Sequence, residues 1–122
     1  MMISQLTLNQ VNPEMRQCIE NCLDCHSVCL NTVFYCLEKG GKHSDTAHIR
    51  LMLDCAEICQ ISANFMLRGS DLHSRTCGIC ADICSRCAAD CQSMGDDSQM
   101  TACADMCRRC AETCEQMSMA MR

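Results

Sequence analysis

The feature that most constrains this chain is a series of cysteines at helical spacing. From Cys77 to Cys114 the cysteines recur every three or four residues, apart from one break after Cys91, and similar steps occur in the first half of the chain. Such spacing puts side chains on one face of an α-helix, at the positions that meet in the centre of a helical bundle. Leu or Ile usually fills these positions, so the sequence predicts helices whose buried faces are lined with thiols.

Capping residues and glycines divide the chain into four predicted helices. Asn12-Pro13-Glu14 is typical of a helix start, and a glycine is typical of a helix end. The helices are expected from Asn12 to Gly40, from Ser44 or Asp45 to Gly69, from Ser70 or Ser74 to Gly95, and from Asp96-Asp97-Ser98 onward. No stretch alternates with the period of a strand. We therefore predict an all-α fold, an antiparallel up-down-up-down four-helix bundle with a Cys-lined core, as one domain over 1–122, with 1–12 as an N-terminal arm or short helix.

The thiols are the candidate metal ligands. A thiolate is a soft donor and Cu(I) is a soft ion that accepts two or three of them. Cysteines four residues apart on a helix lie about 5–6 Å apart at Cβ, so each such pair can converge on one ion, and bridging thiolates bring the capacity close to one ion per Cys. Multiple Cu(I) ions per chain are therefore predicted. The predicted ligands are Cys18, Cys22, Cys25, Cys29, Cys36, Cys55, Cys59, Cys77, Cys80, Cys84, Cys87, Cys91, Cys103, Cys107, Cys110 and Cys114.

Methionines and histidines lie at the ends of the same helical faces. In an up-down-up-down bundle one end gathers Cys36, His48, Met94 and Met100, with His43 nearby. The opposite end gathers Met15, Met66, His73, Met117 and Met121. Such methionines can be apolar plugs as well as donors. We include His48, Met94 and Met100 among the candidate metal ligands, and we expect His26 to be a packing or interface residue and His43 a solvated loop residue.

Other uses of so many cysteines remain open. Cys can act as a small core hydrophobe, and disulfides could form between helices on oxidation. Zinc could bind four converging thiolates, although a structural zinc site needs no thiol ladder along every helix. The ferredoxin cysteine pattern is absent, and the C-x-x-C steps lack the strand–helix context of thioredoxin-like proteins.

Composition limits the partners and the compartment. The net charge is −5 and no run of Lys or Arg occurs, which argues against nucleic acid. No apolar run approaches a membrane span, and the first residues lack the features of a secretory signal. If the chain is complete, we expect it to be cytoplasmic, with reduced thiols.

The cysteine motifs resemble those of the bacterial copper storage proteins, and their cytosolic branch in particular. The resemblance covers about residues 14 to 118. It rests on C-x3-C-x2-C-x3-C from Cys18, on C-A-E-I-C from Cys55 and on C-x2-C-A-D-I-C-x2-C-x3-C from Cys77. It implies a four-helix bundle loaded with many Cu(I) ions, a homotetramer, and admission of copper at one bundle end, which corresponds here to His48, Met94 and Met100.

Assembly and partners follow from a second pattern and from the expected chemistry. An aliphatic stripe beside the first thiols exceeds what the bundle requires, so we predict a homo-oligomer; its members are Ile19, Leu23, Leu30, Val33 and Leu37. Copper donor or acceptor proteins are possible partners. No nucleophile–base pair or cofactor motif indicates an enzyme. The favoured function is cytosolic copper storage and buffering; the alternatives are a zinc or broad metal-binding and detoxification protein, and a thiol redox protein.

Overall fold

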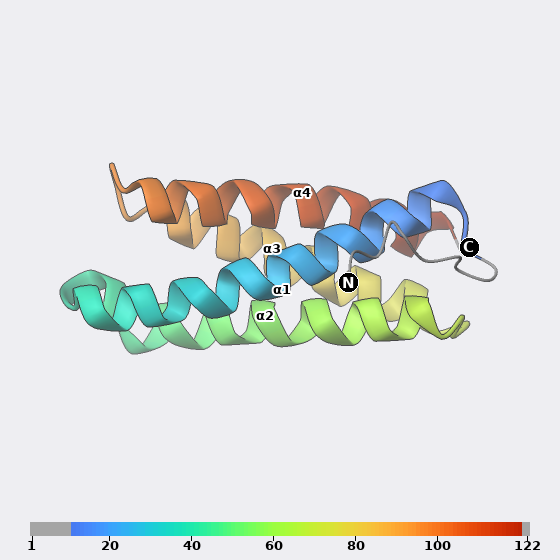
Figure 1. The fold of residues 1–122 in the computed structure, drawn as a ribbon, viewed down its shortest axis with the longest axis horizontal. Helices are drawn as coiled ribbons and strands as arrows, with labels where there is room; N and C mark the ends of the chain where they lie inside the picture. Colours follow the sequence, from blue (N-terminus) through green and yellow to red (C-terminus); the bar gives the residue numbers. More distant parts are fainter. Residues whose placement is uncertain (1–10, 121–122) are drawn as a thin grey trace.

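The computed structural model describes residues 11–120, without the side chain of Ala120. It contains the helices α1 (Pro13–Lys39), α2 (Thr46–Leu67), α3 (His73–Gln92) and α4 (Ser98–Ala120), with a short 3-10 helix, η2 (Gly41–Ser44), after α1. Successive helices run in opposite directions along the long axis of the molecule (Figure 1). The all-α, up-down-up-down prediction is confirmed, and no strand occurs within residues 11–120.

The first and last helices begin at the caps that the sequence indicates. The Asn12 side chain accepts a hydrogen bond from the Met15 N–H at 2.8 Å, and Pro13 occupies the first turn, where its missing N–H costs nothing. Asp97 caps α4, because its Oδ1 accepts from the N–H groups of Gln99 and Met100. Gly40 ends α1 with φ of 74°, a backbone conformation that favours glycine.

The two middle junctions differ from the prediction in detail. Neither Ser70 nor Ser74 caps α3: the helix begins at His73, and the Ser70 hydroxyl accepts from the Leu72 N–H within the preceding turn. The Asp45 side chain precedes α2 but makes no capping hydrogen bond. The 3-10 helix η2 was not predicted, because four residues after a glycine carry no periodic signal.

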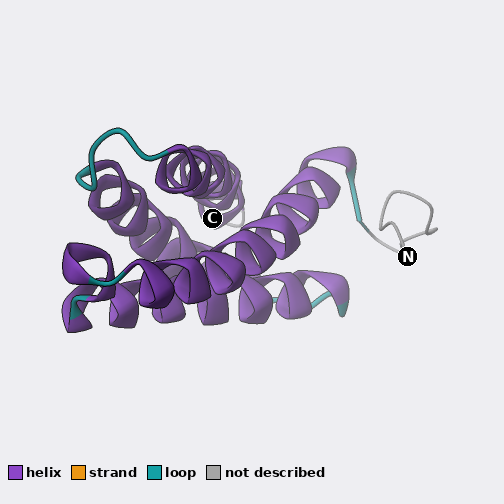
Figure 2. Cartoon of the chain, turned by 60° about the vertical axis from the view of Figure 1, so that its left-hand side comes forward, coloured by secondary structure: helices purple, strands orange, loops and turns teal. Residues whose placement is uncertain are grey.

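Two helical hairpins make up the bundle. Helix α1 packs against α2 and α4, and α3 packs against α4 and α2, so each helix has two antiparallel neighbours. Figure 2 shows α1 and α2 lengthwise and α3 and α4 strongly foreshortened beside them, with the short connections at the ends. This arrangement turns one face of every helix toward a common axis.

The side chains that line this common axis are mostly those of cysteine and methionine. All of the cysteines have 0% exposed surface, as do Met52, Met66 and Met100. Small alanines, including Ala56, Ala81 and Ala104, fill buried positions beside them. The expected Cys-lined core is therefore present along the whole bundle.

The outer surface retains an apolar strip near the α1–α2 connection. Leu30, Phe34 and Leu37 of α1 are 39%, 62% and 49% exposed, and Leu53 of α2 is 44% exposed. Of the aliphatic stripe, Ile19 and Val33 are buried within the chain itself. None of the described helices is both long and apolar enough to span a membrane. The predicted N-terminal arm lies mostly outside the described residues.

Candidate metal centre

The thiols contact one another mainly across helices. Cys114 of α4 lies 3.4 Å from Cys22 and 3.6 Å from Cys18, both on α1, measured between Sγ atoms. Cys59 of α2 lies 3.6 Å from Cys84 and 3.7 Å from Cys80, both on α3. These distances are van der Waals contacts between sulfurs, so neighbouring helices supply donors to the same point.

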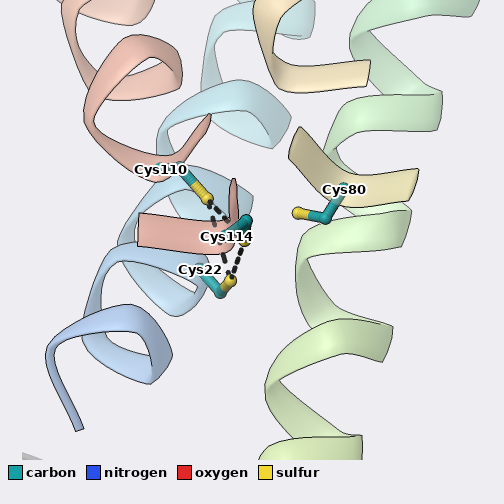
Figure 3. Close-up of side chains that lie close together, drawn as sticks. All are labelled: Cys22, Cys80, Cys110 and Cys114. Carbon is teal, nitrogen blue, oxygen red and sulfur yellow. Dashed lines mark hydrogen bonds between the residues drawn. The ribbon is translucent and has the colours of Figure 1, made fainter. Parts of the chain in front are cut away.

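Several groups of thiols converge closely enough to share a metal ion. In each group the Sγ atoms all lie within 4.8 Å of one another. The groups are Cys22/Cys80/Cys110/Cys114, Cys25/Cys55/Cys59/Cys84, Cys25/Cys29/Cys55/Cys107, Cys59/Cys80/Cys84/Cys110 and Cys18/Cys77/Cys114. Figure 3 shows the first group, with Cys22, Cys110 and Cys114 joined by sulfur–sulfur contacts and Cys80 facing them from α3.

These groups overlap, and the overlap has chemical consequences. Cys59 belongs to two of them, as do Cys80 and Cys110, so no thiol set is isolated from the next. A thiolate can bridge two soft ions. The core therefore offers a continuous donor network rather than separate four-ligand sites.

Thiols four residues apart on one helix, which the sequence suggested as copper-binding pairs, form part of this network. Cys25 and Cys29 lie 3.9 Å apart, Cys80 and Cys84 3.8 Å, and Cys110 and Cys114 4.0 Å. Contacts of equal length join different helices, as between Cys29 and Cys107 at 3.6 Å. The predicted pairs within one helix are therefore present, but contacts between helices are equally close and link these pairs to one another.

Thioethers contact the thiols that lie toward the ends of the core. Cys36 lies 3.6 Å from Met100 Sδ, and Cys77 lies 3.8 Å from Met66 Sδ. Met52 Sδ lies 3.3 Å from Cys91 and 3.6 Å from Cys87. A thioether is a neutral soft donor, so the thiol-only middle of the core is flanked by mixed sulfur sites.

An imidazole completes one of these mixed sites. His48, 3% exposed, places Nε2 3.3 Å from Cys36 Sγ and Nδ1 2.5 Å from a carboxylate oxygen of Asp90. A carboxylate on one ring nitrogen fixes the ring orientation and leaves the other nitrogen as a donor. Cys36, His48 and Met100 therefore come together as the sequence suggested. Met94 is half-buried against the core, without a described contact to these three residues.

The histidine and acidic residues near this end require one correction and one addition. His43 is buried rather than solvated: its Nε2 lies 2.9 Å from Asp97 Oδ2. Asp97, which the sequence placed only at the start of the fourth helix, is held by His43, Tyr35 and Lys39. Sequence proximity could not reveal this, because the partners come from α1 and η2.

The remaining histidines have structural partners. His26 Nδ1 lies 2.7 Å from the Ala56 carbonyl oxygen, which joins α1 to α2 and agrees with the predicted packing role. His73 Nδ1 lies 2.8 Å from the Ser70 carbonyl oxygen. Among the described residues, no contact places His73 against a thiol.

The protonation of the metal-free core follows from burial. Burial, together with the nearby Cys103 and Asp97, raises the pKa of the Cys36 thiol to about 11. Hydrogen bonds with Cys103 and Cys107, together with burial, raise the pKa of Cys29. Neutral thiols can fill an apolar core, whereas a cluster of thiolates without metal could not. Each bound soft cation must therefore displace protons.

Two residues of this region were absent from the predicted ligand set. Met52 lies three residues before Cys55, at the spacing of the cysteine series, but it was not among the predicted donors. Asp90 precedes Cys91 and lies off the thiol face, so only the fold brings it to His48. The sequence signal that could have identified Met52 as a donor was its position at the three-residue spacing of the cysteines.

Comparison with known proteins places these features in a family. The model of the family described as copper storage protein matches residues 11–119. The Nmul_A1745 protein of Nitrosospira multiformis is 46% identical, with a TM-score of 0.81 over 86% of this chain and 94% of that one. The Cu(I)-bound copper storage protein BsCsp3 of Bacillus subtilis is 36% identical, with a TM-score of 0.79 over 86% of this chain and 98% of that one.

A more distant relative shows the same architecture with metal loaded. The copper storage protein Ccsp of Streptomyces lividans, loaded with 10 copper equivalents, is 26% identical, with a TM-score of 0.75 over 93% of this chain and 91% of that one. The Streptomyces protein is also described as a cytosolic copper storage protein. The match over nearly all described residues, with the thiol-lined bundle, shows that this chain belongs to the copper storage protein family.

Proposed function

We propose that this protein stores and buffers Cu(I) by binding many ions per chain to the thiols inside the bundle. The observation that carries this function is the overlap of the thiol groups, in which residues such as Cys59 and Cys110 belong to more than one candidate site. A protein with one structural or catalytic metal needs a single small set of three or four protein ligands. A connected network spread along the bundle instead fits a variable and large load.

Charge balance favours Cu(I) over zinc as the stored ion. One Cu(I) per thiolate leaves the filled core neutral. Zn²⁺ held by four thiolates, for instance Cys59, Cys80, Cys84 and Cys110, leaves two excess negative charges away from water. Burying uncompensated charge is costly, and the penalty rises with each further site. Filling the whole core is therefore chemically reasonable for Cu(I) and not for zinc.

The geometry gives less support to a thiol redox function. The closest pair of thiol sulfurs among the described contacts, Cys22 and Cys114, is 3.4 Å apart, and a disulfide requires about 2.05 Å. All of the cysteines are unpaired and fully buried, which keeps oxidants away from them.

Anaerobic titration of the reduced protein with Cu(I), against a competing chelator, tests the storage function. We expect saturation at many ions per chain, approaching about one per Cys. A parallel titration with zinc should saturate at far fewer ions, and Cu(I) should displace them. Saturation at one or two Cu(I) ions, or retention of zinc against Cu(I), would exclude storage.

We also propose that the protein acts in the cytoplasm as a homotetramer and exchanges copper with donor or acceptor proteins. The cytoplasmic location is supported by the Streptomyces lividans relative, which is a cytosolic copper storage protein. Assembly is supported by the strip Leu30, Phe34, Leu37 and Leu53, which a second copy of the chain could cover. Light scattering at micromolar concentration should give a tetramer for the wild type and smaller species for Phe34→Asp. A monomeric wild type would contradict the assembly.

A further inference from the structure

A buried carboxylate closes the bundle end beside Cys36, and storage itself does not require it. The Asp97 side chain is only 6% exposed. Its Oδ2 accepts hydrogen bonds from the Tyr35 hydroxyl at 2.7 Å and from His43 Nε2 at 2.9 Å, and it forms an ion pair with Lys39 Nζ at 3.4 Å. Five donors converge on this carboxylate when the two backbone N–H groups at the start of α4 are included.

The donors come from separate segments of the chain. Tyr35 and Lys39 lie at the end of α1, His43 lies on η2, and Asp97 lies in the turn between α3 and α4. A second tie joins the same connections, because Lys42 Nζ donates to the Ser93 carbonyl oxygen at 3.4 Å. Without these bonds η2 and the α3–α4 turn would be two independent surface connections.

The segments joined by Asp97 also carry the mixed donor site. Tyr35 directly precedes Cys36, and the Met100 N–H is one of the groups that Asp97 caps. Cys36 and Met100 have no exposed surface, and His48 has almost none. A copper carrier or chelator in solution therefore cannot reach Cys36 while the segments around it stay joined.

We propose that Asp97 is the latch of this bundle end: Cu(I) exchanges between the core and solvent here when the Asp97 contacts to Tyr35, Lys39 and His43 break and η2 separates from the α3–α4 turn. Asp97 binds no copper itself. It sets how often the Cys36 site is exposed, and therefore the rate of exchange but not the capacity. The latch rests on the proposed storage function.

Two substitutions separate the latch from the cap of α4. Asp97→Asn retains an oxygen that can cap the helix, since Asn caps as well as Asp, but it loses the negative charge that holds Lys39 and His43. Tyr35→Phe removes the shortest bond of the latch, together with the longer hydrogen bond at 3.4 Å that the Tyr35 hydroxyl accepts from Lys39 Nζ. Asn21→Ala is the matched control, because Asn21 of α1 donates to Thr113 of α4 at 3.2 Å, toward the opposite end of the same two helices.

The experiment measures the rate at which an excess of chelator removes Cu(I) from the fully loaded protein, together with the total copper bound. Tyr35→Phe should release copper about fivefold faster, as expected from the loss of one hydrogen bond to Asp97, and Asp97→Asn should release it faster still. Total copper should be unchanged in both variants, and Asn21→Ala should match the wild type.

The outcomes distinguish the latch from the storage function. Wild-type rates in both latch variants at full capacity would overturn the latch, as would an equal acceleration in Asn21→Ala. If Asp97→Asn fails to fold, Tyr35→Phe alone decides the same question. Saturation of the wild type at one or two ions would instead overturn storage itself.

Discussion

The two ends of the sulfur core contain similar residues in different arrangements. The Cys36 end consists of Cys36, His48 and Met100, and the Cys77 end consists of Met66, His73 and Cys77. Each has a buried thiol in contact with a buried thioether, at 3.6 Å in the first and 3.8 Å in the second. Each also has a buried histidine. The two histidines, however, make different contacts.

At the Cys36 end the imidazole faces sulfur, and at the Cys77 end it faces the backbone. His48 Nε2 lies 3.3 Å from Cys36, whereas His73 Nδ1 is bonded to the Ser70 carbonyl oxygen. The neighbour of Cys77 is instead the Ser62 hydroxyl, at 3.3 Å, which is a poor ligand for a soft ion. Transfer by ligand exchange needs donors of graded strength near solvent, so this comparison supports the proposal that copper exchanges at the Cys36 end.

The largest expected effect comes from removing each imidazole in turn. His48→Ala should slow copper uptake and removal by at least tenfold, because the nitrogen donor next to Cys36 is lost, while total capacity changes little. His73→Ala is the matched control at the opposite end and should exchange at the wild-type rate. Stopped-flow transfer to a chelator measures both variants. Equal rates in the two variants, or a larger effect of His73→Ala, would contradict the proposal that copper exchanges at the Cys36 end.

A second substitution acts on the same imidazole without removing it. Asp90→Asn replaces the carboxylate that holds His48 Nδ1 with a neutral amide, so the ring is held less firmly in its orientation. We expect exchange to slow by up to about tenfold, less than for His48→Ala. Combining both changes should add nothing to His48→Ala alone. Additive effects of the two substitutions would mean that Asp90 acts on copper independently of His48.

The inner faces of the helices were predictable because their signal is local. The three- and four-residue spacing places every cysteine on one face of its helix whatever the partners, and all of them are buried. Up-down-up-down topology then follows from short connections, and it correctly brings Cys36, His48 and Met100 to one end.

Contacts set by helix rotation and by loops could not be predicted. Cys59 contacts Cys84, Cys80 and Cys110 because of the way α2 faces α3 and α4, which sequence spacing does not determine. The burial of His43 depends on η2 folding back onto Asp97, more than fifty residues away. Both cases require the tertiary arrangement, and the second corrected our expectation of a solvated histidine.

The thioethers give a smaller contrast between the two ends. Met100→Leu and Met66→Leu are nearly volume-conserving, so each should cost less than about 1.5 kcal/mol of stability. Met100→Leu removes a soft donor beside Cys36 and should slow copper removal by about threefold, a partial loss compared with an oriented imidazole. Met66→Leu should leave the rate unchanged. If the two variants slow exchange equally, the thioethers serve as core packing or as general donors and do not distinguish the ends.

The smallest expected effect concerns the stability of the metal-free protein in acid, and it tests whether the polar network belongs to the Cys36 end alone. The Tyr35 hydroxyl, and then the Met100 N–H, His43 and Lys39, hold the pKa of Asp97 below its ordinary value of 3.8, against the opposing effect of burial. A carboxyl whose pKa is lower in the folded state stabilises the fold above its ordinary pKa, and this stability is lost as the pH falls through the folded-state value.

The melting temperature of the wild type should therefore fall by a few degrees between pH 5 and pH 3, and that of Asp97→Asn should not show this fall. At pH 7, Asp97→Asn should melt at a lower temperature than the wild type. Circular dichroism melts of the reduced proteins measure both, with Asn21→Ala following the wild type. The same acid loss in Asp97→Asn would mean that other carboxylates carry it and that the network contributes little to holding this end closed.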